Sequence, residues 1–200
     1  CFGHGITDSN TNADDFYSAG DVNSENVELK NWTISPATGF TDGINMENMF
    51  HQAKRFNGDV SGWTITDPIN MHKVFYECQY FRGKGLSTWK IISNNDSPPF
   101  RMDHMFYNCY RLGLETDIDL SSDSFNTSGG NWDYTHCDSL DKTFHNCRRL
   151  GLGTGAAFRM NGCNLVNLRT VYGQGLYNTF YDCFGHGITD SNTNADDFYS

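Results

Sequence analysis

The hydrophobic residues of this chain recur in five short segments that share one pattern. Each segment begins with Met or Leu and ends four residues later with Phe. A small residue follows three positions after the Phe. In the first four segments, another apolar residue follows three positions after the small one. The segments are MENMF (46–50), MHKVF (71–75), MDHMF (102–106), LDKTF (140–144) and LYNTF (176–180). Apolar positions at steps of four, three and three lie on one face of a helix of about three turns. The pattern therefore predicts five short helices.

A strand-like segment rich in Trp, Ile, Thr and Tyr accompanies each predicted helix. Four of these segments begin at a tryptophan, and the fifth is 168–171: Trp32, Trp63, Trp89, Trp132 and Leu168. One helix and one strand per repeat predict an α/β fold, a leucine-rich-repeat-like solenoid of about five coils with long loop insertions. The phenylalanines of the five segments are expected to form its core ladder: Phe50, Phe75, Phe106, Phe144 and Phe180. The insertions, such as 93–99, 116–130 and 151–164, are rich in Asn, Asp, Ser and Gly and are predicted to be loops.

A much longer repeat encloses these five segments. Residues 1–18 recur unchanged as residues 183–200, at an offset of 182. We therefore interpret 1–182 as one full repeat unit and 183–200 as the start of the next copy. Because each repeat of such an array buries its apolar face only against its neighbours, 1–200 is expected to be one continuous solenoid segment without domain boundaries.

The first coil carries a specific string, Met-x-x-Met-Phe-x-x-Ala-x-x-Phe-Asn-x-Asp-Val-Ser-x-Trp, from Met46 to Trp63. This string resembles the BspA-like leucine-rich repeats of surface proteins in bacteria and protists. The second coil keeps Met71, Phe75 and Trp89 of the pattern, while the later coils keep the helix pattern and lose the Phe-Asn-x-Asp turn to insertions. The resemblance implies a right-handed α/β solenoid, an extracellular or cell-surface location, and a role in adhesion or surface architecture.

Composition narrows the choice of partners. The chain has a formal net charge of −10 at pH 7, which argues against binding to nucleic acid or to an anionic membrane surface. Its aromatic content of 14% is too high for a disordered chain. No apolar run approaches the roughly 18 residues that a membrane-spanning helix needs. We therefore expect no membrane span in this segment.

Four cysteines occupy the small-residue position after the phenylalanine, where the first coil has Ala53. They are Cys78, Cys109, Cys147 and Cys183, and Cys1 duplicates the last of them. Helices packed side by side stand about 8–10 Å apart, which is too far for a disulfide, so a reduced ladder is expected. Cys137 and Cys163 fall outside the ladder and are the disulfide candidate, a bridge that an oxidising compartment permits but does not require.

Three sequons are candidates for N-linked glycosylation: Asn31-Trp-Thr, Asn95-Asp-Ser and Asn126-Thr-Ser. Asn95 and Asn126 lie in predicted insertions, where a glycan could be carried on the surface if the source secretes glycoproteins. Apart from such glycans, the sequence indicates no cofactor.

The segment Asp8-x-Asn10-x-Asn12-x-Asp14 has the alternating oxygen ligands of a calcium loop. It is incomplete as an EF-hand, because Ala13 stands in the place of the turn glycine and Ala19 in the place of the bidentate glutamate. An exposed loop of Asx turns is the simpler interpretation, and calcium stays open as an alternative.

No catalytic pattern is complete. The histidines show no H-E-x-x-H spacing, the cysteines no C-x-x-C spacing, and the serines no G-x-S-x-G elbow. The sequence therefore predicts a protein that is not an enzyme: a structural protein of an extracellular fibre or cell-surface appendage. Its partners would be copies of itself, end to end and possibly side by side. The alternative is an adhesin or ligand-binding repeat module that uses the insertion loops.

Overall fold

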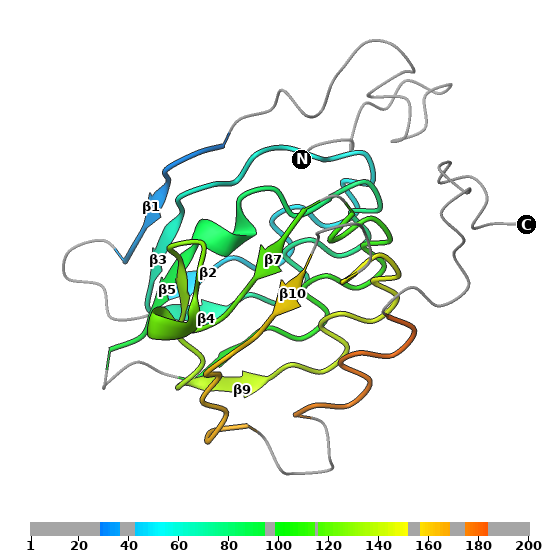
Figure 1. Ribbon diagram of the computed structural model, residues 1–200. Helices are drawn as coiled ribbons and strands as arrows, with labels where there is room; N and C mark the ends of the chain where they lie inside the picture. The colour runs from blue at the N-terminus through cyan, green and yellow to red at the C-terminus, as the bar shows by residue number, and fades with distance from the viewer. Residues whose placement is uncertain are drawn as a thin grey trace, which may run out of the picture.

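The computed structural model describes residues 29–36, 43–94, 99–114, 116–151, 157–168 and 175–183. Within them the chain winds into five coils that follow one another from blue to orange in Figure 1. We number them in chain order: coil 1 (29–58), coil 2 (59–84), coil 3 (85–114), coil 4 (116–151) and coil 5 (157–183). Coils 1 to 4 each add one strand to two parallel sheets, so the coils stack in sequence order.

The first sheet follows the tryptophans. Its strands are β1 (Thr33–Ile34), β3 (Thr64–Thr66), β5 (Lys90–Ile92) and β8 (Asn131–Trp132), in the order β1-β3-β5-β8. All neighbours are parallel and pair equivalent residues, for example Ile65 with Ile91. The four strands predicted at Trp32, Trp63, Trp89 and Trp132 are thus confirmed. The predicted fifth strand, 168–171, lies mostly outside the described residues.

A second parallel sheet was not predicted from the sequence. It consists of β2 (Ile44–Asn45), β4 (Pro68–Asn70), β6 (Phe100–Arg101) and β9 (Cys137–Ser139), in the order β2-β4-β6-β9. Each strand ends just before the Met or Leu that opens the following phenylalanine segment. These strands are only two or three residues long, too short for alternation to distinguish them from loops.

Two of the predicted loop insertions contain a third sheet. In 116–130 lie β7 (Ile118–Asp119) and the 3-10 helix η4 (Asp123–Phe125), and in 151–164 lies β10 (Phe158–Arg159), which pairs with β7 in parallel. A further 3-10 helix, η3 (Leu86–Thr88), contacts β7. Ile118, Asp119 and Leu120 are completely buried. The interpretation of 116–130 as a surface loop is therefore wrong, because its apolar residues cover the core of coils 3 and 4.

The helix-plus-strand α/β solenoid is also wrong. The described residues contain no α-helix, and the phenylalanines lie in what we call the turn segments: 46–53, 71–78, 102–109, 140–147 and 176–183. In every turn segment, the residues two before and two after the phenylalanine have φ between 50° and 60°: Asn48, Gln52, Lys73, Glu77, His104, Asn108, Lys142, Asn146, Asn178 and Asp182. A right-handed helix needs negative φ throughout. Helical turns therefore cannot form in these segments.

Hydrogen bonds in the turn segments alternate between two directions. Within coil 1 the N–H of Met49 donates to the carbonyl of Met46 at 3.2 Å, closing a β-turn whose third residue has positive φ. The N–H of the following residue, Phe50, instead reaches Val74 O of coil 2 at 2.8 Å. The same register recurs from coil 2 to coil 3, from 3 to 4 and from 4 to 5. A helix would use these N–H groups internally, whereas here they join the coils.

The predicted apolar face does form, although not on a helix. Met46, Phe50, Ala53 and Phe56 of coil 1 are all buried, because consecutive turns also direct these positions inward. Apolar positions at steps of four, three and three are therefore compatible with a helix and with consecutive turns. The two structures differ at the two residues of each turn segment that have positive φ. These residues are mostly Asn, Lys, Glu and His, and not the glycines that would have indicated positive φ in the sequence.

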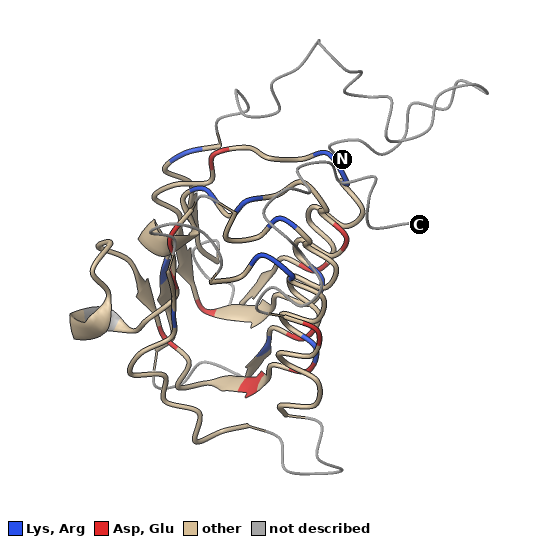
Figure 2. Cartoon of the chain, turned by 45° about the vertical axis from the view of Figure 1, so that its right-hand side comes forward, with Lys and Arg blue, Asp and Glu red and all other residues tan. Residues whose placement is uncertain are grey.

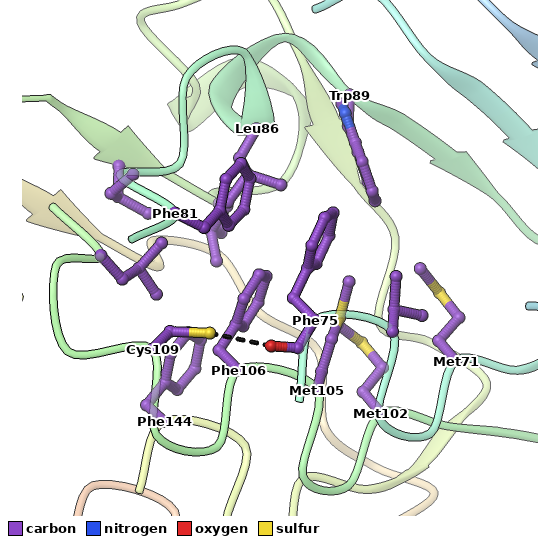
Figure 3. Close-up of a cluster of buried hydrophobic side chains, with 14 of the residues drawn as sticks. Met71, Phe75, Phe81, Leu86, Trp89, Met102, Met105, Phe106, Cys109 and Phe144 are labelled. Atoms are coloured by element: carbon purple, nitrogen blue, oxygen red, sulfur yellow. Dashed lines mark hydrogen bonds between the residues drawn. The ribbon is translucent and has the colours of Figure 1, made fainter. Parts of the chain in front are cut away.

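Aromatic columns run through the stack. The five phenylalanines lie in one column, with ring centroids 5.1, 5.6, 5.5 and 5.4 Å apart in chain order and planes within 14° of parallel. Figure 3 shows Phe75, Phe106 and Phe144 in this core. A second column joins Trp32, Trp63, Trp89 and Trp132 at 5.0, 4.8 and 5.5 Å. Offset or parallel stacking at such distances adds to the burial energy of each ring.

The buried indole N–H groups find partners in the preceding coil. Trp89 Nε1 donates to Val60 O at 2.7 Å, and Trp132 Nε1 donates to Leu86 O at 3.1 Å. The backbones of coils 2 and 3 approach each other closely at Gly85. Its φ is 96°, and an added Cβ would lie 2.3 Å from the backbone nitrogen of Ser61. Only glycine fits this position, which opens η3.

Candidate functional site

Coil 5 differs from the other coils of the described stack. The Met or Leu and the Phe of each turn segment are buried in coils 1 to 4, but in coil 5 Leu176 is 51% exposed and Phe180 is 43% exposed. Tyr177 and Tyr181 beside them are also exposed. Phe180 stacks on Phe144 and keeps part of its surface exposed. The described part of the stack thus ends on an apolar surface.

The cysteine column is built into the turn ladder. The thiols of Cys78, Cys109 and Cys147 are buried and donate to the carbonyl of the phenylalanine in the preceding coil, at 3.0, 3.0 and 3.1 Å. Figure 3 shows the bond from Cys109 to Phe75. Cys183 makes the same bond to Phe144 O. Burial raises the pKa of Cys78, Cys109 and Cys147, so these thiols stay protonated and unreactive.

The disulfide candidate is unbridged in the structure. Cys137 is buried in β9 and Cys163 is half-buried in coil 5, and both are free thiols. Burial raises the pKa of Cys137 to about 12 and that of Cys163 to about 11. Because the thiolate is the species that reacts in disulfide exchange, neither group is activated at neutral pH.

The three sequons lie in different surroundings. Asn31 is exposed before β1. Asn126 is half-buried, and its amide nitrogen donates to Ser87 O at 3.2 Å and Asp119 O at 3.3 Å. That nitrogen is the atom to which an N-linked glycan attaches, so modification there would replace one of its two hydrogens and remove at least one of these bonds. Asn95 lies outside the described residues, as do all four calcium candidates: Asp8, Asn10, Asn12 and Asp14.

A cluster that sequence reasoning missed joins coils 2 and 3. His72, Asp103 and His104 present one ligand atom each, all within 4.8 Å of one another. The Nδ1 atom of His72 lies 2.6 Å from Asp103 Oδ2, and Nδ1 of His104 lies 3.4 Å from the same oxygen. Arg101 contacts both carboxylate oxygens, through Nε at 2.5 Å and a terminal nitrogen at 2.6 Å. We call these four residues the His–Asp cluster.

The electrostatics of the cluster centre on Asp103, whose side chain is only 5% exposed. Burial alone would raise its pKa, but His104, Arg101 and His72 outweigh burial and hold the pKa far below the ordinary value of 3.8. Burial lowers the pKa of His72 against the opposing pull of Asp103. The carboxylate is therefore ionised while His72 favours its neutral form, the pair of states that metal coordination requires.

Aligning the five turn segments would have exposed this cluster. The residue three before the phenylalanine is Glu47, His72, Asp103, Asp141 and Tyr177 in coils 1 to 5. Since the turn segments stack in register, with Lys73 N–H bonded to Asp103 O at 3.2 Å, these side chains form one column. A motif search along the chain misses it because His72 and Asp103 are separated by a whole coil. Figure 2 shows both acidic and basic residues on the coils of the stack.

The comparisons with known proteins place the chain in a family. The model of the family described as "Mycoplasma protein of unknown function, DUF285" matches residues 11–113, just over half of the chain, and the chain belongs to this family. The match includes the turn segments of coils 1 to 3. Neither the curated proteins nor the solved structures contain a significant match. Within the described ranges, no helix is long and apolar enough to cross a membrane.

Proposed function

We propose that this chain is a structural protein: a segment of an extracellular fibre or cell-surface appendage made of tandem 182-residue units. The observation that carries the proposal is the apolar surface of coil 5, where Leu176 and Phe180 are exposed at positions that every earlier coil buries. An apolar slice of this kind is stabilised by another coil of the same kind. The repetition of 1–18 as 183–200 supplies the copy from which that coil would come.

The register of the existing coils defines the proposed junction. In each pair of neighbouring coils, phenylalanine stacks on phenylalanine, and the next residue stacks on its counterpart, as Tyr107 does on His145 at 4.6 Å. In the array, coil 1 of the following unit would pack on coil 5 in this register. Ala53 then faces the carbonyl of Phe180, so this junction lacks the thiol hydrogen bond that the cysteines provide elsewhere.

A surface location and a role without catalysis belong to the same proposal. The resemblance of 46–63 to BspA-like surface repeats supports the location, and the acidic net charge favours solubility of a long array. The buried, protonated thiols and the stacked aromatic columns contribute packing, which suits a construction element. Function would then depend on the number of units rather than on one site.

The test is assembly of a tandem chain of three units, imaged by electron microscopy. Rods of constant axial repeat that lengthen by end-to-end contact are expected. Phe180→Glu in the last unit should stop growth, because it places a charge on the docking surface. Ile92→Glu is the matched control, since Ile92 is 39% exposed but lies within the stack on β5. Rods that grow equally well with Phe180→Glu, or units that separate like beads, would contradict the proposal.

An adhesin is the second candidate, and the third sheet favours it. The insertions of coils 4 and 5 build β7, β10 and η4, where Phe125 is 57% exposed. An ordered element that projects an aromatic residue could hold a ligand. Finite rods with a distinct tip, together with surface binding that Phe125→Ala abolishes, would favour the adhesin over the fibre.

A further inference from the structure

We propose that the His–Asp cluster is a binding site for a divalent transition-metal ion of the Zn²⁺ class, which ties coil 2 to coil 3. The ligands would be His72 from one coil and Asp103 and His104 from the next. This inference is independent of the fibre, because it concerns contacts within one unit.

The ligand set selects the class of metal. Two imidazoles and one carboxylate suit Zn²⁺, Co²⁺ or Ni²⁺, whereas Ca²⁺ and Mg²⁺ prefer oxygen ligands alone. Three protein ligands leave one tetrahedral position for water or for a group from another molecule.

Two of the three distances between ligand atoms need little adjustment. With metal–ligand bonds of about 2.0–2.1 Å, tetrahedral donors stand about 3.3 Å apart. The Nδ1 atom of His104 is already 3.4 Å from Asp103 Oδ2. The 2.6 Å between His72 Nδ1 and the same oxygen would lengthen by less than 1 Å. The two imidazole rings lie edge to face with centroids 5.5 Å apart, so neither blocks the other.

Two buried polar atoms at the cluster make no hydrogen bond of standard geometry. The Nδ1 atom of His104 is buried and makes no hydrogen bond of standard geometry, although imidazole nitrogens buried in this way normally have a partner. The next residue of the same column is Asp141, and its buried Oδ1 atom also lacks a hydrogen bond of standard geometry. A cation between the coils would satisfy the histidine and would be attracted by the additional carboxylate.

Arg101 is the competitor for the site. Its guanidinium neutralises Asp103 in the structure, but its side chain is 42% exposed and it also feels the charge of Asp138. It can therefore turn outward when a divalent ion arrives. Removing Arg101 should therefore strengthen metal binding. If Arg101 and Asp103 formed only a structural ion pair, the same change would weaken the fold and leave metal binding unaffected.

The test uses the whole 200-residue chain, Zn²⁺ alone as the ligand, one fixed neutral pH, and calorimetric titration. Wild type should bind one ion at a saturable site. His72→Ala and His104→Ala should each weaken binding at least about tenfold, and Arg101→Gln should tighten it. His51→Ala and His145→Ala are the controls, because these histidines lie in the same kind of turn but stack on tyrosines outside the cluster. They should bind as wild type does.

A second readout covers variants that fold poorly. Zn²⁺ should raise the Tm of wild type and Arg101→Gln, and Co²⁺ should give them the visible absorption of a tetrahedral site. Absence of binding in both wild type and Arg101→Gln would overturn the proposal. So would binding that persists when His72 and His104 are both replaced, or binding that depends on His51 or His145 instead.

Discussion

Coils 3 and 5 have turn segments of the same design and different surroundings. In coil 3 Met102 and Phe106 are at most 1% exposed, whereas their counterparts in coil 5, Leu176 and Phe180, are about half exposed. Both phenylalanines stack on the preceding coil at nearly the same distance, 5.6 and 5.4 Å. Coil 3 is followed by coil 4, whose Phe144 stacks on Phe106 at 5.5 Å, whereas the described residues end with coil 5. A coil of this protein cannot bury its own apolar side, so its stability depends on its neighbours on both sides.

The largest test of this comparison is truncation of the two phenylalanines. Phe106→Ala should lower the free energy of unfolding by about 3–5 kcal/mol, because it opens a cavity between Phe75 and Phe144. Phe180→Ala should cost clearly less in a single unit, since part of its ring is already in water. Denaturant unfolding measures both. Equal costs would show that coil 5 is covered in solution.

Tryptophan replacement gives the next largest effect. Trp89→Phe leaves the buried carbonyl of Val60 without its indole donor and should cost about 1–3 kcal/mol. Trp32→Phe at the exposed end of the column should cost less, because Trp32 is 39% exposed. The two variants are compared by thermal unfolding. A larger loss at Trp32 would contradict the idea that burial between two neighbouring coils determines the cost.

Asp119 tests whether the third sheet belongs to the core. Burial would raise its pKa, but hydrogen bonds from Ser121 and Thr127 lower it below the ordinary 3.8. A lowered pKa in the folded state means that Asp119 contributes its stability above about pH 4 and loses it as the pH falls further. Asp119→Asn should therefore destabilise the protein by about 1.5–3 kcal/mol at pH 7 and reduce the loss of stability on acidification. Unfolding at pH 7 and pH 3 measures both effects, and an unchanged acid response would exclude Asp119 as its source.

The smallest predicted effect concerns the left-handed backbone. Lys73 has φ of 56°, a conformation that costs a β-branched residue most. Lys73→Val should destabilise by about 1–2 kcal/mol, whereas Lys73→Gly should be nearly neutral. The same pair at Asn178 shows whether coil 5 holds its turn as firmly as coil 2. Equal stabilities of the valine and glycine variants would contradict a positive φ at this position in solution.

The sequence predicted the parts of this protein that have a period. The positions of the core phenylalanines, the number of coils in the described stack and the four tryptophan strands follow from apolar residues at regular spacing. The sequence did not predict the second sheet, because two-residue strands have no measurable alternation. Nor did it predict the third sheet, because Ile118 and Leu120 stand alone in a polar stretch.

The site was less predictable than the fold. Four cysteines can be identified as one column because each stands three residues after the phenylalanine of its segment: Cys78, Cys109, Cys147 and Cys183. The His–Asp cluster was missed because its members come from two coils and become neighbours only through the register of the stack. Proximity of this kind depends on tertiary structure, and a search for spaced motifs along one chain does not sample it.

The sequence by itself determined the repeat, the residues that face inward and the small volume required after each phenylalanine. Tertiary structure decided the backbone conformation that presents them. Helical N–H groups would bond within one segment, but stacking in register offers the N–H of Phe50, Phe75, Phe106 and Phe144 a carbonyl in the next coil. Cross-coil bonding of this kind requires the neighbouring coil to be present, so the left-handed turns, the thiol bonds and the exposed end of coil 5 all follow from contacts that no single repeat contains.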